Sequence, residues 1–161
     1  LQSVKSPCKI HKQYLAVVSG ALPVDAPDVW HTINLPLIQD PANHLKMKTA
    51  ADLSLHSSVL SGKIKTAVTH YHTLFTSQDW SLVTLKLDTG RTHQIRVHMA
   101  SIKHPLLGDD VYGPKKSKYT LEGQCLHAKV LGFVHPRTGE YMEFEVPLPE
   151  YFEKLLNKLD N

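Results

Sequence analysis

The sequence predicts an α+β fold, in which a largely antiparallel sheet is flanked by helices. Two pairs of strand-like segments are each joined by a short turn, at residues 66–87 and 126–146. Two further segments, at residues 92–103 and after Pro147, instead carry apolar residues at helical spacing. Short turns join antiparallel strands, whereas parallel strands need long crossovers, so the two hairpins indicate antiparallel pairing. Helices that are apolar on one side are then expected to cover the sheet.

The first strand is predicted at residues 12–19, KQYLAVVS, and ends at Gly20. Its β-branched and aromatic residues and its apolar character on both faces are typical of a central strand. Residues 20–41 contain four prolines and are interpreted mostly as a loop, with an extended piece near residues 30–35. Residues 46–63 show no clean period.

Two hairpins follow along the chain. The first consists of residues 66–75 and 82–87, which are separated by a polar turn at residues 77–79. The second consists of residues 126–134 and 141–146, which alternate in polarity across a turn that contains proline and glycine. These four strands and the first one supply the predicted sheet.

Two helices are predicted from a period of 3.6 residues. In the first, over residues 92–103, Ile95, Met99 and Ile102 form one apolar stripe that faces the core. Arg96 lies about 100° round the helix from Ile95 and is therefore directed away from the centre of the stripe. A second helix opens at one of two prolines and has four apolar residues on one side: Pro147 or Pro149, and Phe152, Leu155, Leu156 and Leu159.

The composition is that of an ordinary folded domain. The 161 residues are 42% apolar and 20% charged, which suffices for one hydrophobic core and excludes disorder for the bulk of the chain. No apolar run is long enough to span a bilayer. Two cysteines, Cys8 and Cys125, are too few for a disulfide scaffold, so we expect a cytoplasmic protein. The chain begins with Leu1 rather than Met, which favours a fragment of a longer protein.

Positive charge is concentrated in one stretch of the chain. The net charge of +3 is by itself a weak argument for a polyanionic partner. Between residues 91 and 118, however, six residues are basic and two are acidic. The basic residues are Arg91, Arg96, Lys103, Lys115, Lys116 and Lys118. This stretch is where a phosphate backbone is expected to bind.

Common catalytic and metal-binding motifs are absent from the sequence. His93 and His98 are five residues apart, which misses the spacing of a helical zinc pair, and neither HExxH nor CxxC occurs. A Gly-x-Ser-x-Gly motif and a P-loop are absent as well. We therefore expect no metal site. The sequence also offers no motif that would indicate a hydrolase or a nucleoside triphosphatase.

Two arginines lie at the junction between a predicted strand and the first helix. Arg91 stands at the turn after Gly90, and Arg96 is displayed by the helix. Arginines so placed hold a carboxylate or a phosphate with forked hydrogen bonds. The alternative is a pair of solvated surface arginines, and the pattern by itself leaves both open.

Five longer motifs run along the chain: KQYLAVVSG at 12–20, THYHTL at 69–74, TGRTHQIRVH at 89–98, HPLLGDDVYG at 104–113 and LHAKVLGFVHP at 126–136. Together with PLPEYF near the C-terminus, their order and approximate spacing resemble the signature of the RluA-type pseudouridine synthases. These enzymes isomerise uridine in ribosomal or transfer RNA. The resemblance covers nearly the whole chain, and it implies a domain of mixed α and β structure around a largely antiparallel sheet.

The resemblance also implies roles for individual residues. Tyr14 matches the family's active-site tyrosine, which lies against the target base and assists removal of the proton from its C5; without the resemblance it would be interpreted as a core aromatic. Arg96 matches the arginine that pairs with the catalytic aspartate, because a nearby cation keeps a sheltered carboxylate charged. Arg91, His93 and Gln94 belong to the same motif and are expected to position the loop or contact RNA.

The reaction that the resemblance implies is cleavage of the uracil glycosidic bond, reorientation of the base and rejoining through C5, with no cofactor. The target uridine must leave folded RNA and stack on an aromatic side chain such as Tyr14. The basic residues Lys103, Lys115 and Lys116 are expected to bind RNA through flanking phosphates. Residues 126–136 are expected to be sheet core.

One part of the family's pattern is missing. The family's catalytic aspartate lies in an HRLDxxTSG-like motif upstream of the tyrosine strand, and nothing similar occurs in these 161 residues. Asp109 belongs to the turn in HPLLGDDVYG, for which a structural role is expected. We therefore expect residues 1–161 to be the C-terminal portion of a single pseudouridine synthase catalytic domain that lacks its N-terminal half and is inactive by itself.

Two alternatives stay open beside this interpretation. The first is a non-catalytic RNA-binding module built on the synthase fold. The second is a structural fragment, whose exposed sheet edge once paired with the missing strands. For the complete protein we expect RNA as the partner, no membrane association and a monomeric state.

Overall fold

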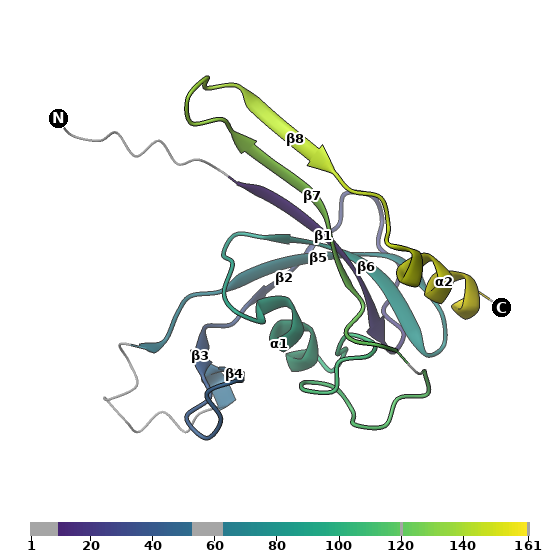
Figure 1. Cartoon of the computed structure of the whole chain (residues 1–161). Coiled ribbons are helices and arrows are strands. Elements are labelled where there is room, and N and C mark those ends of the chain that lie inside the picture. Colours follow the sequence, from purple (N-terminus) through teal and green to yellow (C-terminus); the bar gives the residue numbers. More distant parts are fainter. Residues whose placement is uncertain (1–9, 53–62, 120, 161) are drawn as a thin grey trace.

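A computed structural model describes residues 10–52, 63–119 and 121–160, which form one six-stranded and one two-stranded sheet. The strand order in the larger sheet is β2-β5-β6-β1-β7-β8, and every neighbouring pair is antiparallel (Figure 1). Its strands are β1 (His11–Ser19), β2 (His31–Asn34), β5 (Val68–Thr76), β6 (Trp80–Leu87), β7 (Leu126–Val134) and β8 (Tyr141–Glu145). The predicted α+β class and antiparallel sheet are confirmed.

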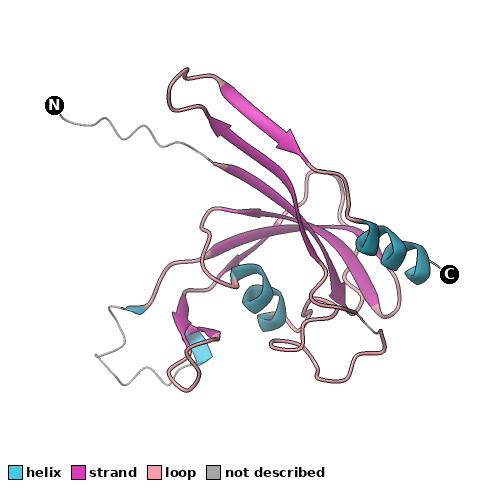
Figure 2. Cartoon of the chain, viewed as in Figure 1, coloured by secondary structure: helices cyan, strands magenta, loops and turns pink. Residues whose placement is uncertain are grey.

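Two helices and a small second sheet complete the described part of the chain (Figure 2). The helices are α1 (Gln94–Ser101) and α2 (Glu150–Leu159). The second sheet pairs β3 (Leu37–Gln39) with β4 (Met47–Thr49), and a short 3-10 helix, η1 (Ala50–Asp52), follows it.

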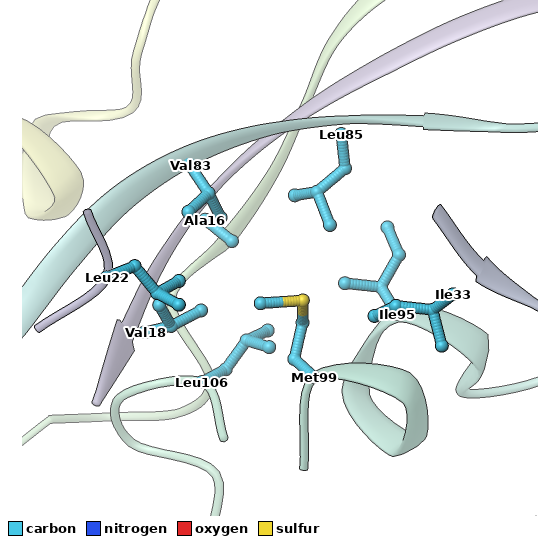
Figure 3. Close-up of a cluster of buried hydrophobic side chains, with 9 residues drawn as sticks. All are labelled: Ala16, Val18, Leu22, Ile33, Val83, Leu85, Ile95, Met99 and Leu106. Atoms are coloured by element: carbon cyan, nitrogen blue, oxygen red, sulfur yellow. The ribbon is translucent and has the colours of Figure 1, made fainter. Parts of the chain in front are cut away.

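Strand β1 lies between β6 and β7, and its alternating side chains enter two hydrophobic clusters. Ala16 and Val18 are fully buried in the first cluster, which also contains Ile95 and Met99 of α1 (Figure 3). Because side chains two residues apart in a strand share a face, this cluster defines the face of the sheet that α1 covers.

The second cluster lies on the opposite face of β1. Leu15 and Val17 contribute from the strand, and Phe152 and Leu155 contribute from α2. The C-terminal helix therefore buries the apolar side that its sequence predicts, and it begins directly after Pro149, one of the two prolines proposed to open it.

Helix α1 is shorter and more deeply buried than predicted. It begins at Gln94 rather than near residue 92, and all of the residues from Gln94 to Met99 are buried. The predicted stripe is confirmed for Ile95 and Met99, but Arg96 is only 9% exposed although it lies off that stripe. The reason is tertiary, since Arg96 packs against Asp109 and Tyr112 of the turn that follows α1.

The structure departs from the predictions in two other places. Strands β3 and β4 have three residues each, too few for the periodicity that would reveal them in a sequence. The second predicted hairpin exists as β7–β8, but the expectation that residues 126–136 are sheet core is wrong for most of them. All five residues of β8 are exposed, and this hairpin projects beyond the body of the sheet (Figure 1).

Candidate active site

Tyr14 lies at the centre of the sheet, on the face that α1 covers. In the register it stands opposite Leu85 of β6, and its side chain packs against the cluster that contains Ala16. The tyrosine is half-buried, and this burial raises the pKa of its phenol above the ordinary value of 10.0. Its phenol therefore stays protonated at neutral pH, and its ring packs against the buried side chains of that cluster.

Arg96 forms a buried, forked ion pair with Asp109. The guanidinium donates from Nε to Asp109 Oδ2 at 2.7 Å and from Nη2 to Asp109 Oδ1 at 2.8 Å. The Asp109 side chain is completely buried, and the Arg96 side chain is 11% exposed. The carbon between the three guanidinium nitrogens also lies 5.0 Å from the centre of the Tyr112 ring. Arg96 is therefore held in one orientation from two sides.

The turn that carries Asp109 explains why this carboxylate pairs so firmly. Asp109 Oδ1 also accepts hydrogen bonds from the backbone N–H groups of Val111, at 3.1 Å, and Tyr112, at 3.0 Å. Burial by itself would raise the pKa of Asp109, but the bonds from Arg96 and from these amides hold it below its ordinary value. The hydrogen bond to Asp109 likewise raises the pKa of Arg96. A buried carboxylate with four donors is an orienting group, and its position gives no access to a substrate.

Tyr112 connects the same turn to the start of α1. Its hydroxyl accepts the backbone N–H of Met47 at 2.9 Å and lies 2.7 Å from His93 Nδ1. Burial lowers the pKa of His93, so we expect a neutral ring. Its Nδ1 then accepts a hydrogen bond from the Tyr112 hydroxyl. His93 has a φ of 54°, a left-handed conformation uncommon for residues other than glycine. The bond from Tyr112 thus holds the residue that precedes α1.

Gln94 is buried at the start of α1, where its side chain joins the turn before the helix to β5. The residue is 2% exposed, and its side-chain amide donates to Val68 O and to Thr69 Oγ1, each at 3.0 Å. Its Oε1 accepts the Thr89 hydroxyl at 2.8 Å and the Arg91 backbone N–H at 3.0 Å. Of the two roles expected for Gln94, these contacts support loop positioning, and burial opposes direct contact with RNA.

The two arginines of the motif do not act as a pair. Arg96 is buried with Asp109, whereas Arg91 is exposed and its Nε donates to the backbone oxygen of Thr66 at 3.0 Å. The arginines were expected to bind a carboxylate or a phosphate. Of the two arginines, only Arg96 binds a carboxylate among the residues that the structure describes. The carboxylate comes from residue 109 of the same chain, 13 residues further on.

The predicted RNA-binding lysines lie on the surface. Lys103, Lys115 and Lys116 are all exposed. Lys115 and Lys116 line a cleft of about 740 Å³, together with Lys118 and the acidic residues Asp79 and Asp110. The cleft is therefore mixed in charge rather than purely basic. Whether these lysines contact RNA stays a prediction, as do the roles of Tyr14 and Arg96 in catalysis.

Other reactive groups in the described residues are few. No group of three or more histidine, cysteine, aspartate or glutamate side chains is arranged to hold a metal ion there. Cys125 is a free, buried thiol whose pKa is raised by burial to about 11, and Cys8 lies outside the described residues. Within the same residues, no helix is long and apolar enough to cross a membrane.

Solved structures with the same architecture define the class of domain. The chain superposes on Human RNA Pseudouridylate Synthase Domain Containing 4 with a TM-score of 0.70 at 23% identity, covering 94% of this chain and 62% of that one. Human RNA Pseudouridylate Synthase Domain Containing 1 gives a TM-score of 0.65 at 24% identity, over 94% of this chain and 66% of that one. The fold is thus that of an RNA pseudouridylate synthase domain.

Sequence comparison identifies the family itself. The profile described as RNA pseudouridylate synthase matches residues 5–101, a segment that contains Tyr14, Arg91 and Arg96. The chain belongs to this family. It is 46% identical over 150 residues to the "Uncharacterized RNA pseudouridine synthase YlyB" of Bacillus subtilis, and 40% identical over 163 residues to the "Ribosomal large subunit pseudouridine synthase D" of Haemophilus influenzae.

These matches cover 93% and 94% of the chain but only 44% and 45% of the two relatives. The chain therefore spans less than half the length of the curated relatives that it matches. The predicted resemblance to pseudouridine synthases is confirmed at the level of the family.

Proposed function

We propose that this chain forms the tyrosine and arginine part of an RNA pseudouridine synthase that acts on ribosomal RNA. The observation that carries the proposal is the immobilised guanidinium of Arg96. It lies on α1, the helix that covers the same face of the sheet as Tyr14, and both residues fall inside the segment that matches the family. The name of the Haemophilus influenzae relative supports ribosomal RNA of the large subunit as the substrate class.

In this proposal Tyr14 lies against the flipped uracil and Arg96 orients the nucleophile. Asp109 accepts from Nε and from one N–H of Nη2, so a second carboxylate would bind through Nη1 and the remaining N–H of Nη2. A cation fixed beside a sheltered carboxylate keeps the latter ionised, as attack on C1′ of the ribose or on the uracil ring requires. The stationary ion pair to Asp109 supplies the preorganisation, because Arg96 need not reorient when the substrate binds.

These 161 residues are proposed to bind RNA without isomerising it, because they hold no HRLD-like motif. The test is release of tritium from ribosomal RNA labelled at C5 of uridine, with the purified chain and with the Haemophilus influenzae relative, named a ribosomal large subunit pseudouridine synthase, as the positive control. We expect no release by the chain alone. Release at a rate near that of the control would show that another group of this chain serves as the nucleophile.

RNA binding through the exposed lysines has a separate test. The affinity for a fragment of large-subunit ribosomal RNA is measured by fluorescence anisotropy at several salt concentrations. Replacing Lys115 and Lys116 by glutamine should reduce the slope of log affinity against log salt by roughly 1.5 to 2. Lys154→Gln is the matched control, since Lys154 lies on α2 and already pairs with Glu150 at 2.6 Å. Equal slopes for both variants would remove these two lysines from the RNA-binding surface.

A further inference from the structure

A row of side chains crosses the sheet from β2 to β1 on the face of α1. The register places His31 opposite Tyr71, Tyr71 opposite Leu85, and Leu85 opposite Tyr14. The face is established by Ile33, two residues after His31, which is buried in the same cluster as Ile95 of α1. His31 and Tyr71 therefore lie on the same face as the proposed base-binding tyrosine, in the same row.

The two rings at the outer end of this row are stacked. The centres of the His31 and Tyr71 rings are 4.9 Å apart, and the ring planes differ by 26°. Tyr71 is packed against the core, whereas the His31 side chain is 47% exposed. The pair thus presents one aromatic ring to solvent on top of another that is fixed in the protein.

A buried carboxylate fixes the exposed ring. Asp25 Oδ1 lies 2.7 Å from His31 Nε2, and Asp25 Oδ2 accepts the backbone N–H of Thr73 at 2.8 Å. The Asp25 side chain is 8% exposed, and the Asp25 backbone N–H also donates to Thr73 O. His31 is therefore held by a stack on one side and by an anchored carboxylate at its edge, although it stands on the surface.

We propose that His31, supported by Tyr71 and Asp25, is a stacking platform for a nucleobase that flanks the target uridine. Neighbouring strands lie about 4.8 Å apart, so His31, three strands from Tyr14, is roughly 14 Å away. That separation suits a nearby nucleotide of the same strand rather than the target base itself. A flat ring that is already ordered loses little conformational freedom on binding, and every nucleobase offers a π-face to it. The inference rests on the proposed RNA substrate and adds a contact that selects for unpaired bases beside the target.

The experiment compares His31→Ala with His31→Phe by fluorescence anisotropy on a labelled, single-stranded 12-nucleotide RNA of mixed sequence. We expect His31→Ala to weaken binding by roughly 5- to 150-fold, the range that corresponds to loss of one stacked base. His31→Phe should retain the affinity, because its ring replaces the imidazole. The salt dependence should stay unchanged in both variants, since stacking neutralises no phosphate.

His70→Ala is the matched control. His70 also belongs to a surface histidine–aspartate pair, with Nε2 2.8 Å from Asp88 Oδ2, but it neighbours Tyr71 in β5 and therefore faces the opposite side of the sheet. Its removal should leave RNA affinity unchanged. Urea unfolding of each variant establishes that the fold is retained.

A second measurement locates the stacked base. The RNA is made with an abasic site at each position in turn, and the penalty of His31→Ala should vanish at the position that stacks on this ring. The platform would be overturned by any of three results: RNA affinity that is unchanged in His31→Ala, an equal loss of affinity in His70→Ala, or a loss in His31→Phe as large as that in His31→Ala. None of these results would contradict the proposed function. Failure of the unsubstituted chain to bind RNA at low salt would overturn the platform together with the RNA-binding part of the proposed function.

Discussion

Asp109 shows how one residue organises the arginine on which the proposed function depends. Its carboxylate receives two bonds from Arg96 and two from backbone amides, all in a completely buried position. Replacing it by asparagine leaves the guanidinium buried without its counter-charge. We expect Asp109→Asn to lower the free energy of unfolding by about 3 kcal/mol or more, measured by urea denaturation. The exposed neighbour Asp110→Asn is the control, and equal losses in the two variants would contradict the role assigned to Asp109.

Gly108 makes the turn before Asp109 possible. Its φ is +78°, and a Cβ at this position would overlap the backbone oxygen of Gly123. Gly139, in the β7–β8 turn, has a similar φ of +71° but open space around it. Gly108→Ala should therefore cost roughly 3 kcal/mol or more in unfolding free energy, and Gly139→Ala only about 1 to 2 kcal/mol. Comparable values for both would mean that the close approach to Gly123 is relieved without cost.

At the scale of the elements, one histidine holds α1 to strand β5 and to the segment that follows β2. His98 is fully buried, with Nδ1 2.8 Å from Thr69 Oγ1 on β5 and Nε2 2.9 Å from Leu35 O beyond the end of β2. Burial lowers the pKa of His98 below 6.5, and the bond to Leu35 only partly offsets this. Burial also lowers the pKa of His93, which precedes α1. The neutral imidazole is therefore the favoured form both before the helix and in its last turn, where His98 lies.

Acidification should therefore weaken the fold. The unfolded chain binds protons near pH 6.5, whereas folded His98 binds its proton only at lower pH. The stabilisation is fully present above pH 6.5 and is lost as the pH falls through the folded-state pKa, at about 1.4 kcal/mol per pH unit for each histidine. Urea denaturation between pH 7.5 and pH 5 measures this slope. His98→Gln should make it shallower, and an identical slope would exclude His98 as its source.

At the scale of the whole molecule, the β7–β8 hairpin is the least buried part of the sheet. The register places four apolar side chains on one of its faces, the side of the sheet that α1 covers: Leu131, Phe133, Met142 and Phe144. Strand β8 also forms one edge of the sheet, with no neighbour on its outer side among the described residues. An exposed apolar edge of this kind favours association with another chain.

We expect the isolated chain to self-associate through this hairpin. The sedimentation coefficient should rise with protein concentration, and Met142→Lys combined with Phe144→Lys should abolish the rise. The same charge placed in the turn, Thr138→Lys, should leave it intact, because residue 138 lies off the apolar face. A concentration-independent coefficient for the unsubstituted chain would show that the exposed face is tolerated in solution.

Local sequence determined the elements whose signals are long and repetitive. Strand β1, both hairpins and the C-terminal helix each follow from residues within about twenty positions of one another, so their existence could be predicted from the order of residues along the chain. The pattern at the junction of strand and helix marked Arg91 and Arg96 in the same way, whereas Gln94 was marked only by the resemblance to the family. Burial of all sides of α1 could not be predicted, because it depends on β4, which is too short to leave a pattern, and on the Asp109 turn, which packs against Arg96.

The sequence by itself therefore determined the class of fold, the family resemblance and the identity of the candidate residues, since these depend on local order along the chain. Only the tertiary structure decided what those residues touch. The partner of Arg96 lies 13 positions away, and the row of His31, Tyr71, Leu85 and Tyr14 draws on four strands. Such contacts arise from strand register and from packing around a shared core, which no periodicity within a single segment records.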